Sequence, residues 1–416
     1  MTALTSGDSN AAAIPADWQV ASLKTLCTKI QDGTHFSPEI KGKDYLYVTS
    51  RNIGFGRLNV ADAPRIDAVQ HAAIYRRCDV KLGDLLLTKD GANTGNAALN
   101  TLDEEFSLLS SVAFLRFDLR QHSAAYFLQQ ILSSQGQRRI KDAMSGNAIT
   151  RLTLAKINNL SFPYPSLPEQ NAIAAALSDV DALLAGLDRL IAKKRDLKQA
   201  AMQQFLNGNT RLPGYSSDWE TVRLAETSAF ITKGSTPTTY GFAWQSTGVL
   251  FLRSECVSPE GLDLAESMFI SEEAHLTLRR SAVRSNDLLI TITGNVGRVV
   301  KLPEDFGEAN INQHIARIRI IDESMHPSWV YHYLSQPRLR RHFEKITTGQ
   351  AYPQVSLAQV RNAVIPRPTI GEQQEISASL DDMDEEITRL VARRNKTGAL
   401  KQAMMQELLT GRTRLI

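Results

Sequence analysis

The chain repeats itself along much of its length. Displaced by 203 positions, residues 145–213 align without a gap on residues 348–416, and 27 of the 69 aligned positions are identical. The same displacement superposes shorter upstream segments: Arg76-Arg77 on Arg279-Arg280, Asp84–Thr88 on Asp287–Thr291, and Val112-Ala113 on Ile315-Ala316. A repeat of this length is far longer than a solenoid unit. We therefore predict a pseudo-twofold molecule with two related but unequal surfaces.

Composition limits the classes of protein that this chain can belong to. With 416 residues, 43% hydrophobic and 22% charged, it is long enough for two or three soluble domains. The three cysteines are isolated and lack metal-ligand spacing, which indicates a cytoplasmic protein without a zinc site. No apolar run approaches the roughly 20 residues of a membrane span. The net charge of +3 is too small to identify a nucleic-acid-binding protein, so any basic surface must be local.

Each repeat divides into a mixed region and a helical region. The mixed regions contain short β-like runs, such as Leu85–Thr88 and Leu288–Thr293, separated by glycine-rich loops. We predict an α+β fold in which two mixed α/β domains are separated by two long helices. The expected segments are a flexible tail at 1–13, a first domain at 14–165, a central helical spacer at 166–213, a second domain at 214–368, and a C-terminal helical spacer at 369–416.

The helical regions have the pattern of a coiled coil. Apolar residues alternate four and three apart from Ile173 to Ile191 and again from Ile376 to Leu390. Capping boxes are predicted at both starts, Ser166 with Glu169 and Thr369 with Glu372. Gly208 and Gly411 would end the helices in left-handed conformations. Each helix would then run about 40 residues, or roughly 60 Å.

Charge indicates how the two helices meet. Both are acidic near the start and basic near the end, as in Asp179 with Lys198 and Asp382 with Lys401. An antiparallel pair would place each acidic start against a basic end, whereas a parallel pair would place like charges together. We expect an antiparallel coiled coil. The alternative is two independent helices, each packed on its own domain.

Motifs of catalytic sites are missing from the sequence. It has no phosphate-binding loop with a lysine, no Gly-x-Ser-x-Gly elbow and no His-Glu-x-x-His motif. It also lacks an Asn/Asp-Pro-Pro-aromatic tetrapeptide of the type found in amino-methyltransferases. We expect a chain that is not itself an enzyme.

Duplicated junctions carry a resemblance to a known family. The pattern Pro-x-Pro-Ser/Thr-x-x-Glu-Gln occurs at 163–170 and at 366–373, each time before a long helix, and Trp18 and Trp219 stand at the starts of the two domains. In duplicate and in this order, these features resemble the DNA-specificity subunit of type I restriction-modification enzymes over nearly the whole chain.

This resemblance implies a function and a set of partners. Two target-recognition domains would be held apart by the antiparallel helices, and the chain would be non-catalytic. It would bind double-stranded DNA and dock two adenine-methyltransferase subunits, which bring S-adenosylmethionine. Two motor and nuclease subunits, which use ATP and Mg, would join the full complex.

The predicted arrangement suits a divided DNA target. Domains at the ends of a rigid strut could read two short half-sites about one helical turn, roughly 34–36 Å, apart. The two domains keep their strand landmarks while their loops diverge. We therefore predict a bipartite, asymmetric target.

The divergent loops contain the candidate DNA contacts. Asn, Gln, Arg and Lys can pair with base edges, while Ser and Thr suit phosphate. For any single residue the better interpretation is an ordinary surface polar group, and we expect about a third of the set to contact DNA. In the first domain the candidates are Thr34, His35, Ser50, Arg51, Asn52, Lys89, Asn93, Thr94, Asn147 and Arg151. In the second they are Lys233, Ser235, Thr236, Arg253, Ser254, Thr293, Asn295, Arg298, Gln350, Tyr352 and Gln354. The repeated pairs Arg76-Arg77 and Arg279-Arg280 are either phosphate clamps or partners in structural ion pairs.

The late parts of both helices carry a soft apolar face. Its members are Met202, Phe205, Met404, Met405 and Leu408. Two interpretations are open: internal packing, or a docking surface for the methyltransferase subunits.

Two other functions compete with the main interpretation. The chain could be the recognition subunit of a related two-component type II methyltransferase and nuclease. It could also be a coiled-coil adaptor that does not read DNA.

Overall fold

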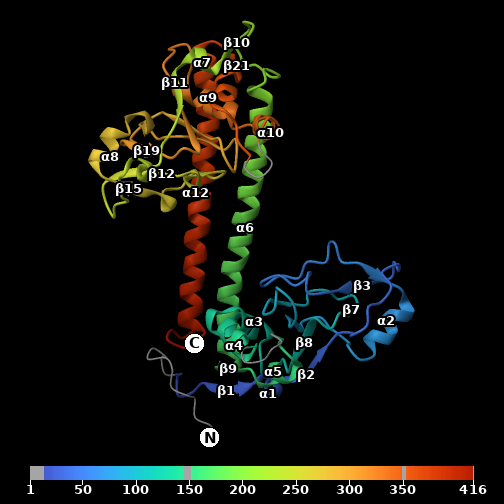
Figure 1. The fold of residues 1–416 in the computed structure, drawn as a ribbon. Coiled ribbons are helices and arrows are strands. Elements are labelled where there is room, and N and C mark those ends of the chain that lie inside the picture. Colours follow the sequence, from blue (N-terminus) through green and yellow to red (C-terminus); the bar gives the residue numbers. More distant parts are fainter. Residues whose placement is uncertain (1–13, 145–150, 349–352, 416) are drawn as a thin grey trace. The chain divides into compact units, whose positions relative to one another are not determined.

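The computed structural model describes residues 14–144, 151–348 and 353–415 (Figure 1). The chain separates into two units: the first consists of Met1–Asp188 with Ala392–Ile416, and the second of Arg189–Val391. Both long helices cross this division, so each unit contains part of each helix. The predicted segment boundaries do not follow this division and stay predictions. Among the described residues, no helix is both long and apolar enough to cross a bilayer.

The first unit is a mixed α/β domain. Its strands are β1 (Gln19–Ser22), β2 (Cys27–Asp32), β3 (Tyr45–Val48), β4 (Arg65–Ile66), β5 (Leu85–Thr88), β6 (Ala97–Leu99), β7 (Phe106–Leu108), β8 (Val112–Phe117) and β9 (Ser161–Tyr164). Its short helices are α1 (Leu23–Leu26), α2 (Ala68–Tyr75), α3 (Ala124–Leu132), α4 (Ser134–Met144) and α5 (Leu154–Asn159). The strands form an antiparallel sheet in the order β2-β8-β5-β6, a sheet in the order β4-β3-β7 in which β3 and β7 are parallel, and the separate pair β1-β9.

The second unit repeats this plan. Its strands are β10 (Glu220–Arg223), β11 (Ser228–Lys233), β12 (Val249–Leu252), β13 (Val257–Ser258), β14 (Gly261–Leu262), β15 (Met268–Ile270), β16 (Ala282–Val283), β17 (Leu288–Thr291), β18 (Val299–Lys301), β19 (Ala309–Ile311), β20 (Ile315–Ile320) and β21 (Val364–Arg367). Its short α-helices are α7 (Leu224–Thr227), α8 (Glu272–Thr277), α9 (Pro327–Leu334), α10 (Pro337–Lys345) and α11 (Leu357–Arg361), and its 3-10 turns are η1 (Pro237–Tyr240), η2 (Ser254–Cys256), η3 (Leu264–Glu266) and η4 (Arg279–Ser281). The sheets are ordered β11-β20-β17-β18 and β15-β12-β19-β16, with the pairs β10-β21 and β13-β14.

Strand register preserves the displacement seen in the sequence. Leu85 lies opposite Leu115 in the first unit, and Leu288 lies opposite Ile318 in the second, so both partners move by the same 203 positions. The duplication is therefore a repeat of tertiary structure as well as of sequence.

The apolar run Leu85-Leu86-Leu87 explains why β5 is a central strand. Leu85 and Leu87 pack in the core beneath the helices, while Leu86 packs in a second core shared with β3 and β7. Successive side chains of a strand point to opposite faces, so a strand that is covered on both faces must be apolar throughout. In β17 of the second unit, Leu288 and Ile290 face one core and Leu289 faces the other.

The long helices α6 (Leu167–Phe205) and α12 (Ile370–Leu408) are antiparallel within each unit. In the first unit, Asp181 binds Lys401 at 2.7 Å and Asp188 binds Arg394 at 3.0 Å, so positions rise along α6 as they fall along α12. In the second unit, Lys194 binds Glu386 at 2.7 Å and Lys198 binds Asp384 at 2.5 Å, in the same sense. The fold class and the antiparallel pairing are thus confirmed.

The predicted C-terminal ends of the two long helices are confirmed, whereas the capping boxes predicted at their N-terminal ends are not. Gly208 and Gly411 have φ values of 68° and 74°, the left-handed conformation expected after a helix. At the start of α12, the amide of Glu372 lies 3.4 Å from the Thr369 hydroxyl, but the carboxylates of Glu169 and Glu372 do not complete capping boxes. They are buried and bind Arg414 and Arg211 instead, because those guanidinium groups offer stronger, paired hydrogen bonds.

Candidate nucleic-acid interface

In the first unit, the ends of three strands meet at one turn, residues 109–112. The Thr34 amide, after β2, donates to the Leu108 carbonyl at 2.8 Å, and the Leu109 amide donates to the last residue of β3, Val48, at 3.0 Å. The amide of Lys89, after β5, donates to the Ser111 carbonyl at 2.8 Å. Loops that are far apart in the sequence therefore form one cluster, which we call the first loop cluster.

The second unit builds the same arrangement around turn 312–315. The amide of Ser235 donates to Ile311 at 3.2 Å, that of Asn312 donates to the end of β12 at 3.1 Å, and that of Ile292 donates to the His314 carbonyl at 2.9 Å. The segments at 152 and 355 join the clusters equivalently, with amide bonds to Lys89 and Ile292 of 3.2 and 2.9 Å. We call this set the second loop cluster. The two clusters share a hydrogen-bonded backbone and differ in their side chains.

Most of the predicted DNA-binding residues lie in these clusters, with different exposure. Those with exposed side chains are His35, Arg51, Asn93, Arg151, Lys233, Asn295 and Gln354. Those that are half-buried are Ser50, Thr94, Ser235, Thr236, Arg253, Ser254, Thr293 and Arg298. Asn147, Gln350 and Tyr352 lie outside the described residues.

Three predicted contacts are buried and have structural roles. The Asn52 side chain accepts from the Thr49 amide at 2.9 Å and donates to the Asn59 carbonyl at 3.0 Å, so its amide holds a turn rather than facing a base. The Thr34 hydroxyl accepts from the Phe36 amide at 3.3 Å. Lys89 is only 3% exposed and is fixed by carboxylates. All three side chains are buried and have structural hydrogen bonds or ion pairs, and their direct contact with DNA stays a prediction.

A charged network crosses the first loop cluster. The Lys89 ammonium lies 2.9 Å from Asp90 and 3.4 Å from Asp32, and Arg151 forms a paired interaction with Asp90 at 2.6 and 3.0 Å. His35 lies 3.3 Å from Asp32. Burial would raise the pKa of Asp90, but the hydrogen bonds from Arg151 and Lys89 outweigh it and lower the pKa. Asp90 therefore stays ionised and holds both cations.

The second loop cluster lacks such carboxylates at the equivalent positions. Lys233 ends β11 where Asp32 ends β2, and the residues that correspond to Lys89, Asp90 and Arg151 are Ile292, Thr293 and Gln354. Near this cluster, Arg253 forms an ion pair with Glu266 at 3.1 Å. The two clusters consequently offer different electrostatic surfaces to a ligand.

The repeated arginine pairs are exposed on their units. Arg76 and Arg77 follow α2, while Arg279 and Arg280 lie in η4. Arg77 lines a cavity with Asp32, Thr34 and His35, which brings it to the first loop cluster. Within the described part of the chain none of the four arginines forms an ion pair, so the structural ion-pair interpretation finds no support there. Their role as phosphate clamps stays a prediction.

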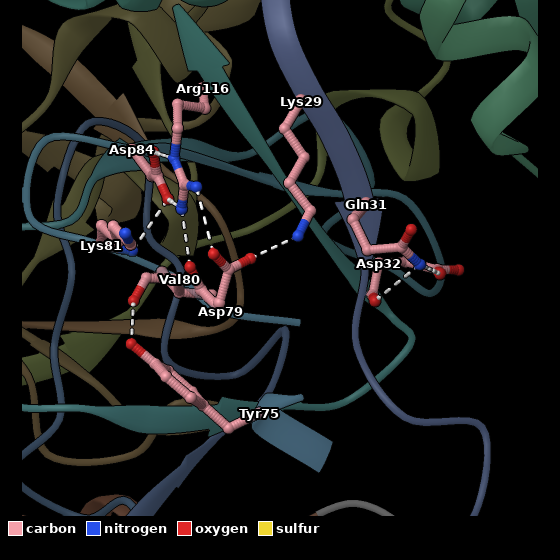
Figure 2. A network of polar contacts seen from close by, with 9 residues as sticks. All are labelled: Lys29, Gln31, Asp32, Tyr75, Asp79, Val80, Lys81, Asp84 and Arg116. Atoms are coloured by element: carbon pink, nitrogen blue, oxygen red, sulfur yellow. Dashed lines mark hydrogen bonds and ion pairs between the residues drawn. The ribbon is translucent and has the colours of Figure 1, made fainter. Parts of the chain in front are cut away.

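At the opposite end of the same strands, an ion pair braces each sheet. Arg116 of β8 binds Asp84, which precedes β5, at 2.8 and 2.9 Å, and also contacts Asp79 (Figure 2). Arg319 repeats the bond to Asp287 at 2.7 Å in the second unit. The two aspartates belong to the repeated segments Asp84–Thr88 and Asp287–Thr291, whereas their arginine partners were not predicted from the sequence. The signal was present, because both arginines recur at the same displacement of 203.

The two turns at the centre of the clusters were likewise not predicted from the sequence. Ser110 and Ser111 stand at the tip of the first, and Gln313 and His314 at the tip of the second. They directly precede the repeated segments Val112-Ala113 and Ile315-Ala316, so divergence immediately before a repeated strand could have identified them.

The predicted docking face is largely internal. Met405 and Leu408 are buried in the core of the first unit, with Met404 packed against it. Met202 is buried in the core of the second unit, with Phe205 packed against it. The structure supports internal packing, the first of the two interpretations, for these residues, and a docking role stays a prediction.

Comparisons with known proteins agree with this architecture. The family model for the type I restriction modification DNA specificity domain matches residues 15–193 and 216–397. The putative type I restriction enzyme MjaX specificity subunit of Methanocaldococcus jannaschii is 23% identical over 97% of this chain and 95% of its own length. The EcoBI specificity subunit of Escherichia coli is 26% identical over 64% of this chain and 61% of its own.

A solved structure shows the same fold. The S subunit of the type I restriction-modification system of M. genitalium has a TM-score of 0.63 at 15% identity, and the alignment covers 97% of this chain and 98% of that one. Because the family model matches both halves of the duplicated chain, this protein belongs to the type I restriction-modification DNA specificity family and carries two copies of its domain.

Proposed function

We propose that this chain is the sequence-specific DNA-recognition subunit of a type I restriction-modification complex. Each unit reads one half of an asymmetric, bipartite target through its loop cluster, and the two long helices set the gap. One observation carries this proposal: both units build the same hydrogen-bonded scaffold, yet present Ser110-Ser111 on one and Gln313-His314 on the other. A shared scaffold with different tips suits two domains that perform the same task on different sequences.

Catalysis belongs to other subunits in this proposal. Two adenine-methyltransferase subunits would dock on the chain and bring S-adenosylmethionine, and motor and nuclease subunits would supply the ATP- and Mg-dependent steps. The proposal also places the complex in the cytoplasm, where its DNA is accessible.

The test is co-expression with the neighbouring methyltransferase gene, followed by single-molecule sequencing of host DNA to map methylated adenine. The proposal predicts one split motif. Replacing residues 109–112 with the sequence of 312–315 should change one half of that motif and leave the other half and the gap intact. If a stable complex methylates nothing, or methylates without sequence preference, the chain is an adaptor and the proposal is wrong.

A related two-component type II system would give the same methylation pattern. The two cases separate by their partners: a type I complex should bind a motor subunit and cleave unmodified DNA only with ATP, whereas the related system should cleave without it.

A further inference from the structure

Turn 312–315 carries the exposed side-chain amide of Gln313 on a backbone that hydrogen bonds hold in place. The Asn312 backbone bonds to Leu252, the last residue of β12, and the His314 backbone bonds to Ile292, the residue after β17. The Asn312 side chain accepts from the His314 amide at 3.1 Å. The Ile315 amide closes the turn on Asn312 at 3.3 Å. The Gln313 side chain itself is exposed. An exposed amide on so constrained a turn loses little conformational freedom when it binds a ligand.

Two neighbours orient this amide. The Thr236 hydroxyl donates to Gln313 Oε1, and Gln313 Nε2 donates to His314 Nε2 at 3.1 Å. A glutamine amide has two N–H donors and an oxygen with two lone pairs. After these two bonds, the amide keeps one N–H donor and one oxygen lone pair for a ligand.

That remaining edge matches one base. In the major groove, adenine presents an acceptor at N7 and a donor at N6, and a glutamine amide pairs with both. Guanine presents two acceptors there, cytosine presents a donor only, and thymine presents an acceptor only, so none of these three satisfies both amide positions.

We propose that Gln313 reads an adenine through the major groove in the half-site of the second unit, with Thr236 and His314 as positioning residues. This inference rests on the proposed function and deepens it by assigning one base to one side chain. The equivalent residue of the first unit is Ser110, so the two half-sites need not share this adenine.

The first test uses the full chain co-expressed with its methyltransferase partner and maps methylated motifs. Gln313→Ala should relax one adenine position in one half-site, with discrimination falling about 10-fold or more, and leave the other half unchanged. Gln313→Glu should move the preference at that position toward cytosine, because a carboxylate accepts from the cytosine amino group. Ser110→Ala is the matched control and should leave this position intact.

Positioning is tested at Thr236. Thr236→Val removes the hydroxyl donor and should weaken discrimination at the same position, whereas Thr236→Ser keeps the hydroxyl and should restore it. This pair also decides the proposal if Gln313→Ala lowers the melting temperature too far for the complex to assemble.

A chemical substitution in the DNA completes the test. Once the position is mapped, 7-deazaadenine placed there removes the N7 acceptor. Binding of a target duplex should weaken about 10-fold for the wild-type complex and stay unchanged for Gln313→Ala. If the wild type methylates a split motif and Gln313→Ala methylates the same motif unchanged, this inference alone is overturned. Absence of any split motif in the wild type overturns the proposed function and the inference with it.

Discussion

Glu169 and Arg414 form a paired ion pair at 2.6 and 2.8 Å although 245 positions separate them in the sequence. Arg414 also binds Asp17 and lies over the ring of Trp18. In the second unit, Glu372 and Arg211 form the same bond at 2.7 and 2.8 Å. In each pair the glutamate comes from one copy of the repeat and the arginine from the other. Each unit is therefore completed by the end of the other copy.

Removing Arg414 should destabilise the first unit. Glu169 is only 1% exposed, so Arg414→Met would leave a buried carboxylate without its partner. We expect the melting temperature to fall by about 5 °C in differential scanning calorimetry. Arg412→Met is the control, because Arg412 pairs with Glu407 at the surface and its loss should change little. Equal shifts in the two variants would contradict a structural role for the crossed pair.

Gly33 is predicted to tolerate no side chain. A Cβ at this position would lie 2.0 Å from the Leu108 carbonyl oxygen, so Gly33→Ala must push β2 away from the turn at 109–112. Gly234 stands in the same place in the second unit, 1.8 Å from the Ile311 oxygen. Either alanine should lower both melting temperature and DNA affinity.

A helical glycine provides the contrast. Nothing lies within 4 Å of a Cβ at Gly186, inside α6, so Gly186→Ala should raise stability by about 1 kcal/mol. Denaturant titration of both alanine variants measures the difference. Stabilisation by Gly33→Ala would show that the close approach at β2 is not required.

Asp90 is predicted to restrain DNA binding by the first loop cluster. Asp90→Asn would weaken the paired interaction that holds Arg151, and the exposed guanidinium group of Arg151 would then be available to a phosphate. We expect tighter binding to a mixed-sequence duplex and a dependence of affinity on salt that is steeper by about one ion. Fluorescence anisotropy over a salt series checks this. Asp118→Asn, which breaks only the surface pair with Arg120, should leave the slope unchanged; a matching slope for Asp90→Asn would exclude the restraint.

His332 should make the second unit sensitive to acid. Burial lowers the pKa of His332 although Asp381 binds it at 2.7 Å, and Lys198 opposes protonation further. The same bond and Lys301 overcome the effect of burial on Asp381 and hold its pKa at about 2. An unfolded chain takes up the histidine proton below its ordinary pKa of 6.5, whereas the folded chain resists it. Stability therefore falls as the pH drops below about 6.5, while the Asp381 contribution is retained above its ordinary pKa of 3.8 and is lost as the pH falls from 3.8 to about 2.

The first unit supplies a natural substitution to test this sensitivity. Gln129 stands at the position equivalent to His332 and donates to Asp181 at 3.1 Å. Between pH 7.5 and 5.5, the melting temperature of His332→Gln should fall by roughly 2–3 °C less than that of the wild type. Identical pH profiles would assign the acid sensitivity to other groups, such as His326, whose pKa is also lowered by burial.

The sequence determined the duplication, the central strands and the antiparallel helices, because each depends on local periodicity or on a repeated pattern. Leu85-Leu86-Leu87 is apolar at every position, so both faces of this strand must be covered, whichever elements cover them. The heptads and the acidic-to-basic gradients define the direction of the helices for the same reason. Each of these features can be recognised without knowing which distant segments are in contact.

Only the tertiary structure decided which side chains meet. Contacts between distant segments pair Glu169 of one repeat copy with Arg414 of the other. Such contacts also bury Lys89 and Asn52 and place Gln313 at the centre of its loop cluster. A polar residue in a loop has the same appearance in the sequence whether its hydrogen bonds go to the backbone or to a ligand. Its role is set by the neighbours that folding brings within hydrogen-bond distance, and those neighbours come from strands that local sequence cannot pair.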